Sequence, residues 1–351
     1  MSTNKTNKTM NKIFISMVIL ALISGCMINS KNSGKKNMVV MFYNTENLFD
    51  TINDLSNAGD DEFLPNTEKQ WNTQKYLKKL NDIARVITSV QPNNYPQFIG
   101  MAELENSNVL SDLISLTDLK NAGYEIIHRQ SNDYRGIDVG LLYKKDNFKH
   151  ISTQYYTIKF SEDTTYTTRE ILYCKGIFNK KDTLHIFVNH WPSRSSGQDE
   201  TEKKRVKVAQ VLRSKVDSVF MQNAKANIII MGDLNDEPDN LSIQNTLLAS
   251  DTIKMPNELL NLMYKLDKLG KGTYNFKGNW NMLDHLIISK NLTNPSNKLH
   301  VNELGGQIVM KDFMIYTDAK TNQISPNKTY GGKKYYGGIS DHFPVYAIFN
   351  Y

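Results

Sequence analysis

Short apolar runs with strand-like composition recur along the chain, and their order restricts the possible folds. Strands are predicted at Met38–Tyr43, Gln97–Ala102, Val139–Tyr143, Ile171–Phe178, Thr183–Asn189, Ile228–Met231, Leu283–Ser289 and Phe343–Phe349. Apolar residues at helical spacing predict helices at Glu68–Val90, Ser107–Leu119 and Glu200–Gln222. Several strands follow one another with no helix between them. The pattern therefore predicts an α/β (α+β) fold in which two mixed β-sheets pack face to face with helices outside.

The first residues have the composition of an export signal. Three lysines precede the apolar run Ile13–Ile23, which is shorter than the roughly 20 residues that span a bilayer. The segment Ile23–Cys26 resembles the bacterial lipobox, in which the cysteine is lipidated. We therefore expect a lipoprotein signal peptide at 1–26, a flexible polar tether at 27–37 and one folded domain at 38–351.

The same segment predicts where the protein resides. Lipid on Cys26 would anchor the exported chain in the bacterial cell envelope. Met27 is not the aspartate that retains many lipoproteins at the inner membrane, which favours the outer membrane. Of the two cysteines, only Cys174 would remain as a thiol, and its apolar neighbours predict a buried core residue. The net charge of +6 allows a phosphate-bearing substrate without requiring one.

Polar residues repeatedly stand where the apolar runs begin or end. They include Asn44, Glu103, the segments Asn189–Pro192 and Gly232–Asn235, Asp284, and the segment Ser340–His342. In a packed sheet such residues can meet at one edge of the core. Taken singly, each has an alternative interpretation as a turn, a cap or a solvent-facing loop.

Hydrolysis of a phosphodiester requires this combination of side chains. A hard cation that neutralises phosphate charge takes oxygen ligands, chiefly from Asp and Glu. A histidine can accept a proton from water near neutral pH, and a carboxylate can orient that histidine. Amide donors can hold the phosphate oxygens as charge develops on them.

The order of these motifs resembles the endonuclease/exonuclease/phosphatase superfamily across Met38–Tyr351. The stretches Gly-Asp-Leu-Asn at 232–235 and Ser-Asp-His-Phe-Pro-Val at 340–345 are its most specific parts. The resemblance implies a four-layered sandwich with a catalytic domain at 38–351. One departure is Ala102, because many relatives carry Gln before the metal-binding Glu.

The resemblance also implies a role for each motif residue. Glu103 would be the principal metal ligand, assisted by Asn44 and Asp341, with Mg²⁺ as the cofactor and Mn²⁺ as an alternative. The catalytic set would be His342 as the base, Asp284 as its partner, Asp233 and Asn235 positioning the nucleophile and phosphate, and His190 holding or protonating the phosphate. The substrate-binding set would be Arg169, Arg135, Trp280 and Asn189; for Arg135 a surface turn, and for Trp280 a packing role, remain alternatives.

Three functions are compatible with this set. The first is a nuclease acting on DNA, with RNA as a further substrate, because the segment from Asn189 to Arg194 resembles secreted bacterial nucleases. The second is a hydrolase of phospholipid, sphingomyelin or a small phosphate ester. The third is a catalytically inactive binding protein. We expect a monomer with a nucleic-acid substrate, a membrane contact through Cys26 and no protein partner.

Overall fold

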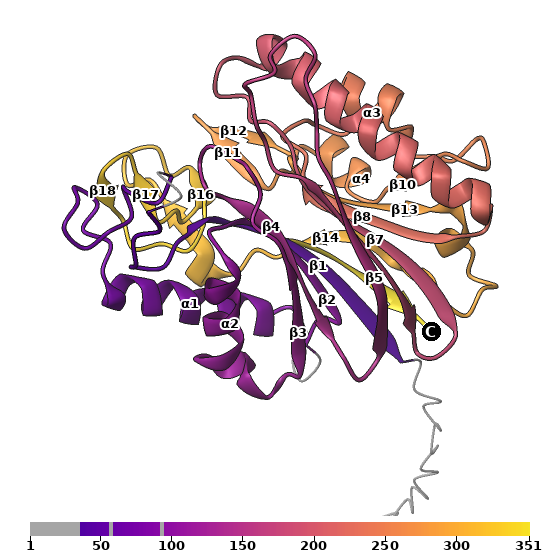
Figure 1. Cartoon of the computed structure of the whole chain (residues 1–351), viewed down its shortest axis with the longest axis horizontal. Coiled ribbons are helices and arrows are strands. Elements are labelled where there is room, and N and C mark those ends of the chain that lie inside the picture. The colour runs from indigo at the N-terminus through magenta and orange to yellow at the C-terminus, as the bar shows by residue number, and fades with distance from the viewer. Residues whose placement is uncertain (1–35, 56–58, 92–94) are drawn as a thin grey trace, which may run out of the picture. The chain divides into compact units, whose positions relative to one another are not determined.

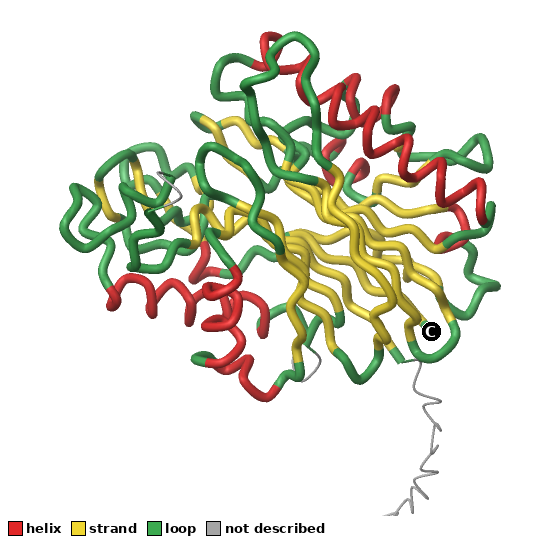
Figure 2. The backbone as a smooth tube through the Cα atoms, viewed as in Figure 1, coloured by secondary structure: helices red, strands yellow, loops and turns green. Residues whose placement is uncertain are grey.

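The structure, a computed structural model, describes residues 36–55, 59–91 and 95–351. The described residues belong to one compact unit, Lys36–Tyr351. Two β-sheets occupy its centre and helices lie against their outer faces (Figure 1). Figure 2 shows the same layers, with strands in the middle and helices outside. The predicted fold class is confirmed, with two mixed sheets and helices consistent with the four-layered sandwich.

The first sheet has six strands in the described part of the chain. In spatial order they are β14 (His300–Ile308), β19 (Val345–Asn350), β1 (Asn37–Leu48), β2 (Phe98–Leu104), β4 (Asp138–Lys144) and β3 (Tyr124–His128). Strands β1 and β2 are parallel, whereas β19 is antiparallel to β1. The carboxyl ends of β1 and β2 therefore lie at the same edge as the start of β19.

The second sheet has seven strands among the described residues. In spatial order they are β5 (Phe148–Tyr156), β6 (Ile171–Phe178), β7 (Asp182–His190), β8 (Asn227–Asp233), β13 (Asp284–Ser289), β10 (Leu259–Asn261) and β9 (Ala249–Ser250). Strands β7 and β8 are parallel and β13 runs antiparallel to β8. The ends of β7 and β8 thus lie beside the start of β13.

Small hairpins and helices complete the unit. The hairpins are β11–β12 (Tyr274–Phe276 and Asn279–Asn281), β15–β16 (Ile315–Thr317 and Ile324–Pro326) and β17–β18 (Tyr330–Gly331 and Lys334–Tyr335). The α-helices are α1 (Thr73–Thr88), α2 (Ser107–Ser115), α3 (Gln198–Gln222) and α4 (Tyr264–Lys268). Short helical turns occupy Asp118–Asn121, Leu241–Thr246, Lys290–Thr293 and Asp312–Met314. No helix within the described ranges is long and apolar enough to cross a membrane.

Strand alternation explains the layers. Along β1, Val39 and Met41 pack in the cluster that includes α1 and α2, whereas Val40 and Phe42 pack in the cluster between the two sheets. On β8, Ile229 and Met231 face that intersheet core, while Ile228 and Ile230 pack under α3. Successive side chains of a strand point to opposite faces, so a strand covered on both sides reads as a continuous apolar run.

The eight predicted strands and three predicted helices correspond closely to observed elements. The strands β3, β5, β9, β10 and β14 of the two main sheets, the small hairpins and α4 were not predicted. Cys174 is a free, buried thiol in the intersheet core, as expected. The predicted signal peptide at 1–26 and the tether residues 27–35 lie outside the described residues. Only the tether's last residues, Lys36 and Asn37, are described, and Asn37 opens β1.

Candidate active site

Strand ends from both sheets bring the predicted motif residues to one edge of the sandwich. Asn44 and Glu103 lie near the carboxyl ends of β1 and β2, and His190 and Asp233 end β7 and β8. Asp284 begins β13, opposite Asp233 in the ladder. His342 lies just before β19, and Asn235 directly follows β8. Because parallel strands end and antiparallel strands begin at this edge, residues distant in sequence become neighbours.

His342 and Asp284 form a buried pair across the two sheets. The carboxylate Oδ2 of Asp284 lies 2.7 Å from Nδ1 of His342. The hydroxyl of Ser340 donates to the carbonyl of Asn44 and accepts from the backbone N–H of His342, which fixes the loop that carries the imidazole. The ring of Tyr274 lies 5.0 Å from the imidazole, centroid to centroid. This packing holds the imidazole with Nδ1 toward Asp284.

Asp233 stands at the centre of a second cross-sheet contact. Its Oδ2 accepts a hydrogen bond from the amide of Asn44 at 3.0 Å and lies 3.5 Å from Nε2 of His190. Its Oδ1 accepts from the backbone N–H of Asn235, whose side-chain amide donates to the carbonyl of Trp191. Asn235 has φ of 50°, the left-handed conformation that asparagine tolerates best after glycine.

Glu103 and Asp341 are the two acidic residues predicted to hold metal. Glu103 adopts φ of 60°, and its Oε2 accepts from the backbone N–H of Asn47. Its Oε1 accepts from the guanidinium of Arg135 at 3.2 Å and lies 3.9 Å from Nε2 of His190. Asp341 is less buried, with one oxygen 4.0 Å from Nε2 of His342. Both carboxylates line the same cavity.

A buried group of three side chains could also bind a metal. Ligand atoms of Asp233, Asp284 and His342 lie within 4.8 Å of one another. A cation placed among all three would compete with the hydrogen bond between His342 and Asp284. A cation held by Glu103 and Asp341 would leave the hydrogen bond between His342 and Asp284 intact.

Burial and crowded charges shift the proton affinities at this edge. Burial alone would lower the pKa of His342, but Asp284 and Asp233 outweigh it and raise that pKa well above its ordinary value. Burial raises the pKa of Asp233 to about 6, against the opposing effect of His342. Burial, with Arg169 and Arg135, holds the pKa of His190 well below its ordinary value. His190 is therefore neutral near pH 7, and its Nε2 can donate one hydrogen bond.

A buried lysine that was not predicted supports the acidic side of the site. Lys79 on α1 donates from Nζ to the carbonyl of Glu46 at 2.5 Å and to the hydroxyl of Thr329 at 2.7 Å. The carboxylate of Glu46 accepts from the backbone N–H groups of Thr329 and Tyr330. Burial lowers the pKa of Lys79 to about 8, against the opposing attraction of Glu46 and Asp341. The position of Lys79 on the apolar face of the predicted helix was the sequence signal for its burial.

The cavity above these residues has a volume of about 400 Å³. It is lined by Glu103, Arg135, His190, Ser193, Arg194, Ser195, Asp233, Asn235, Tyr274, Phe276, Asn281, Leu283, Asp341 and His342. Tyr274 and Phe276 belong to the β11–β12 hairpin and were not predicted. The signal for them was a pair of alternating aromatic residues before a Lys-Gly turn, which is typical of a hairpin.

Comparison with known proteins identifies the family. A model of the endonuclease/exonuclease/phosphatase family matches residues 39–350. The chain belongs to the endonuclease/exonuclease/phosphatase family. It is a phosphoesterase of this type. A search of curated proteins found no match.

Solved structures share this fold at low sequence identity. A humanized TDP2 of D. rerio is 14% identical, with a TM-score of 0.56, over 90% of this chain and 99% of that one. The human Nocturnin catalytic domain is 16% identical, with a TM-score of 0.53, over 90% and 94%. A mannosyl-6-phosphatase of Bacteroides thetaiotaomicron is 17% identical, with a TM-score of 0.54, over 90% and 100%. At these identities the likeness shows the fold alone.

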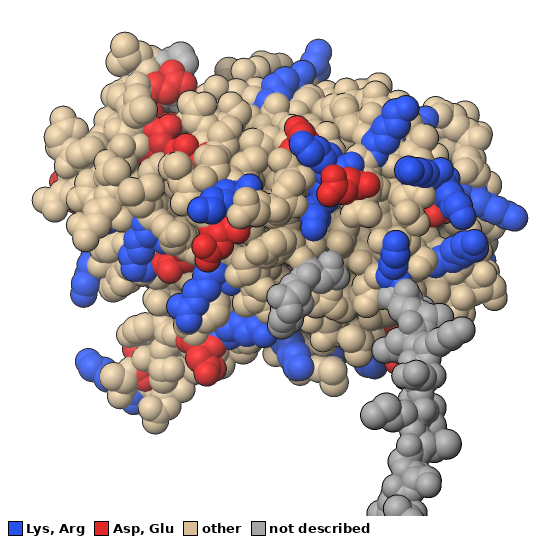
Figure 3. All heavy atoms as spheres, turned by 90° about the horizontal axis from the view of Figure 1, so that it is seen from below, with Lys and Arg blue, Asp and Glu red and all other residues tan. Residues whose placement is uncertain are grey.

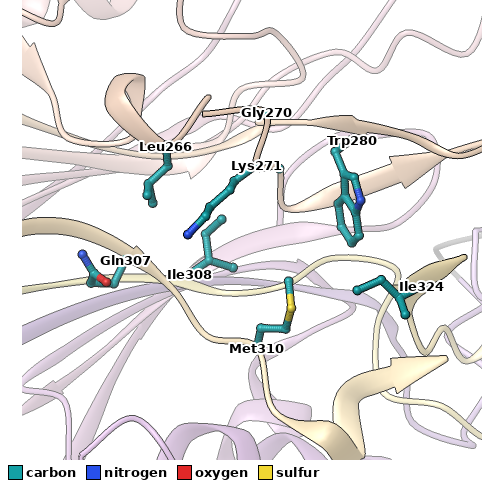
Figure 4. A pocket seen from close by; sticks show the side chains of 9 residues that line it. Leu266, Gly270, Lys271, Trp280, Gln307, Ile308, Met310 and Ile324 are labelled. Atoms are coloured by element: carbon teal, nitrogen blue, oxygen red, sulfur yellow. The ribbon is translucent and has the colours of Figure 1, made fainter. Parts of the chain in front are cut away.

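Four residues were predicted to contact substrate. Of these, only Arg135 lines the active-site cavity. Asn189 is fully buried and accepts from the indole N–H of Trp191. Arg169 is buried and lines a smaller adjoining hollow. Trp280 lines a different cavity, where Figure 4 shows its ring together with Lys271 and Met310. Its ring stacks on Phe343 with centroids 5.8 Å apart.

Proposed function

We propose that this phosphoesterase is a nuclease that hydrolyses DNA, with RNA as a further substrate. The observation that carries the proposal is the surroundings of the His342–Asp284 pair. Arg135 and Arg194 line the cavity for phosphate, while Tyr274 and the half-exposed ring of Phe276 offer surfaces on which a base can stack. A cavity of about 400 Å³ also accommodates more than a phosphate group.

The charges on one face of the molecule are compatible with a local site for nucleic acid. On the face seen in Figure 3, Lys and Arg side chains are spread, with Asp and Glu among them. We infer that affinity for phosphate comes chiefly from the arginines in the cavity. This arrangement favours recognition of a few nucleotides around the cleaved bond.

The residues of the cavity supply the steps of hydrolysis. Because Asp284 and Asp233 raise the pKa of His342, the ring must first lose its proton. Its Nε2 then accepts a proton from the attacking water, and Asp284 holds the ring and stabilises the resulting cation. Asp233 and Asn235 orient the water and the phosphate. The neutral His190 donates a hydrogen bond from Nε2 to a phosphate oxygen while charge develops there.

The donor set fits a hard divalent cation, for which we propose Mg²⁺ with Mn²⁺ as a substitute. Glu103 and Asp341 offer carboxylate oxygens, and Asp233 adds further negative charge nearby. Asn44 offers an amide oxygen, which also accepts from the backbone N–H of Glu46. Oxygen ligands of this kind are those that Mg²⁺ prefers. A bound cation would neutralise charge on the phosphate as it is attacked.

Plasmid nicking tests the proposed activity. The full-length chain in mild detergent is incubated with supercoiled plasmid in Mg²⁺, in Mn²⁺ and in EDTA, beside His342→Ala. We expect nicking that requires metal and is lost in the variant. Metal-dependent hydrolysis of sphingomyelin, inositol phosphates or mononucleotides, with no nicking in either metal, would refute the nuclease assignment.

We further propose that the protein is exported and anchored in the outer membrane by lipid on Cys26, as a monomer. The support is the sequence pattern of residues 1–26, which lies outside the described residues. Metabolic labelling with palmitate should mark the wild-type chain and leave Cys26→Ser unlabelled. Equal labelling of both chains would contradict the anchor.

A further inference from the structure

A second hollow adjoins the active-site cavity. It has a volume of about 70 Å³ and shares Arg135, Ser193 and Ser195 with the larger cavity. Arg169 and Lys204 add two more cationic side chains to its lining. No Asp or Glu is among its described lining residues. The hollow is thus small, polar and positively charged, and it opens beside the catalytic residues.

Arg169 is the buried element of this hollow. Its side chain is 3% exposed, and its Nη1 and Nη2 donate to Asp133 and to the carbonyl of Trp191. Its Nε–H is buried and has no hydrogen-bond partner. Arg169 therefore adds a fixed positive charge at the wall of the hollow.

Lys204 lines the hollow from helix α3. It projects from the first part of α3, and its Nζ lies 3.4 Å from the centroid of the Tyr166 ring. This contact orients the ammonium group without neutralising it. Asp133 offsets the charge of Arg169 in part, and Glu103 that of Arg135, whereas Lys204 interacts electrostatically with Asp163 without forming an ion pair among the described residues.

We propose that this hollow is a subsite for a second phosphate group, one linkage away from the phosphate that is cleaved. Arg135 and Lys204 would bind its oxygens, and the buried charge of Arg169 would attract it. The inference rests on the proposed nuclease function and specifies its substrate as an oligonucleotide with at least two phosphates. A substrate with a single phosphate would leave the subsite empty and bind less tightly.

The test compares DNA substrates that differ by one phosphate. The kcat/KM of the full-length chain is measured on a dinucleoside monophosphate and on a trinucleoside diphosphate of thymidine. We expect a preference of about tenfold for the longer substrate, typical of one added charge-assisted contact. Lys204→Ala should reduce that preference about fivefold through KM, and Lys204→Glu should reduce it further. Lys203→Ala is the matched control, because Lys203 is exposed and lines neither cavity.

Binding without turnover separates this inference from the proposed function. Anisotropy of fluorescein-labelled tetrathymidylate is measured in EDTA with the same variants. Weaker binding by Lys204→Ala than by Lys203→Ala supports the subsite even where no cleavage is seen. Equal binding and an equal substrate preference in the two variants would overturn the subsite and leave the nuclease assignment standing. Failure of the wild type to cleave any DNA would refute the nuclease assignment instead.

Discussion

At the scale of single residues, the contact between His342 and Asp284 determines what the imidazole can do. Asp284 is fully buried, and its second oxygen, Oδ1, has no hydrogen-bond partner. The carboxylate is therefore dedicated to the ring nitrogen that it faces at 2.7 Å. Removing its charge changes both the proton affinity of His342 and the nitrogen that carries the proton.

The substitution Asp284→Asn tests this role. We expect kcat on DNA to fall by about 100-fold or more, because the neutral amide neither stabilises the imidazolium nor selects its tautomer. KM should change little, because Asp284 does not line the cavity. Steady-state kinetics with Mg²⁺ provide the measurement, and circular dichroism checks the fold. A variant with wild-type kcat would show that the pair is structural.

At the scale of elements, the buried His285 connects neighbouring segments of the seven-stranded sheet and does not line the cavity. His285 on β13 is fully buried. Its Nε2 lies 2.9 Å from the carbonyl of Asp236, and its Nδ1 lies 3.0 Å from the amide nitrogen of Asn261 on β10. These partners require a neutral ring that donates from Nε2 and accepts at Nδ1. Burial lowers the pKa of His285 to about 4, against weaker opposing contacts.

This neutral histidine makes stability depend on pH. The folded-state pKa is depressed, so the unfolded chain takes up the proton first as the pH falls below about 6.5. The contribution of His285 is complete above that pH and decreases by about 3 kcal/mol as the pH approaches 4. Urea unfolding from pH 7.5 to 4.5 should show a flatter pH dependence for His285→Gln than for the wild type. His150→Gln, an exposed control, should match the wild type; equal slopes in all three would contradict the assignment.

At the scale of the whole molecule, carboxylates from both sheets converge on one cavity. Glu103 and Asp341 come from the six-stranded sheet and its approach loop, and Asp233 comes from the seven-stranded sheet. Burial raises the pKa of Asp341, and Glu103 and Asp233 raise it further, against the opposing effect of His342. A cation bound here would offset charge contributed by both sheets and so stabilise the sandwich.

Metal should therefore raise the melting temperature. A ligand at about 100 times its Kd stabilises the folded state by about 2.7 kcal/mol. Differential scanning fluorimetry with Mg²⁺ against EDTA should show an upward shift in the wild type and a much smaller one in Glu103→Gln. Glu125→Gln, which changes an exposed carboxylate, is the control. A full shift in the Glu103 variant would place the cation elsewhere, with the Asp233, Asp284 and His342 group as the alternative.

Most of the strands that were not predicted have a weak apolar pattern. Along β5, exposed and half-buried residues follow Phe148, and β14 is half-buried over most of its length. Strands of this kind lie at sheet edges, where one face or both meet solvent and the apolar signal weakens. The long central strands are covered by a sheet on one face and helices on the other, and they were predicted. The three-residue β10, between β13 and β9, is too short to give a pattern and was missed.

The sequence by itself determined the strand and helix pattern, the family and the motif residues that meet at the sandwich edge. Local periodicity and residue chemistry carry that information. Only the tertiary structure decided which residues touch: His342 and Asp284 are 58 positions apart, and Asn44 and Asp233 are 189 apart. It also directed Trp280 to another cavity and placed Tyr274 against His342. Such contacts depend on how two sheets and a hairpin pack together, which no short stretch of sequence specifies.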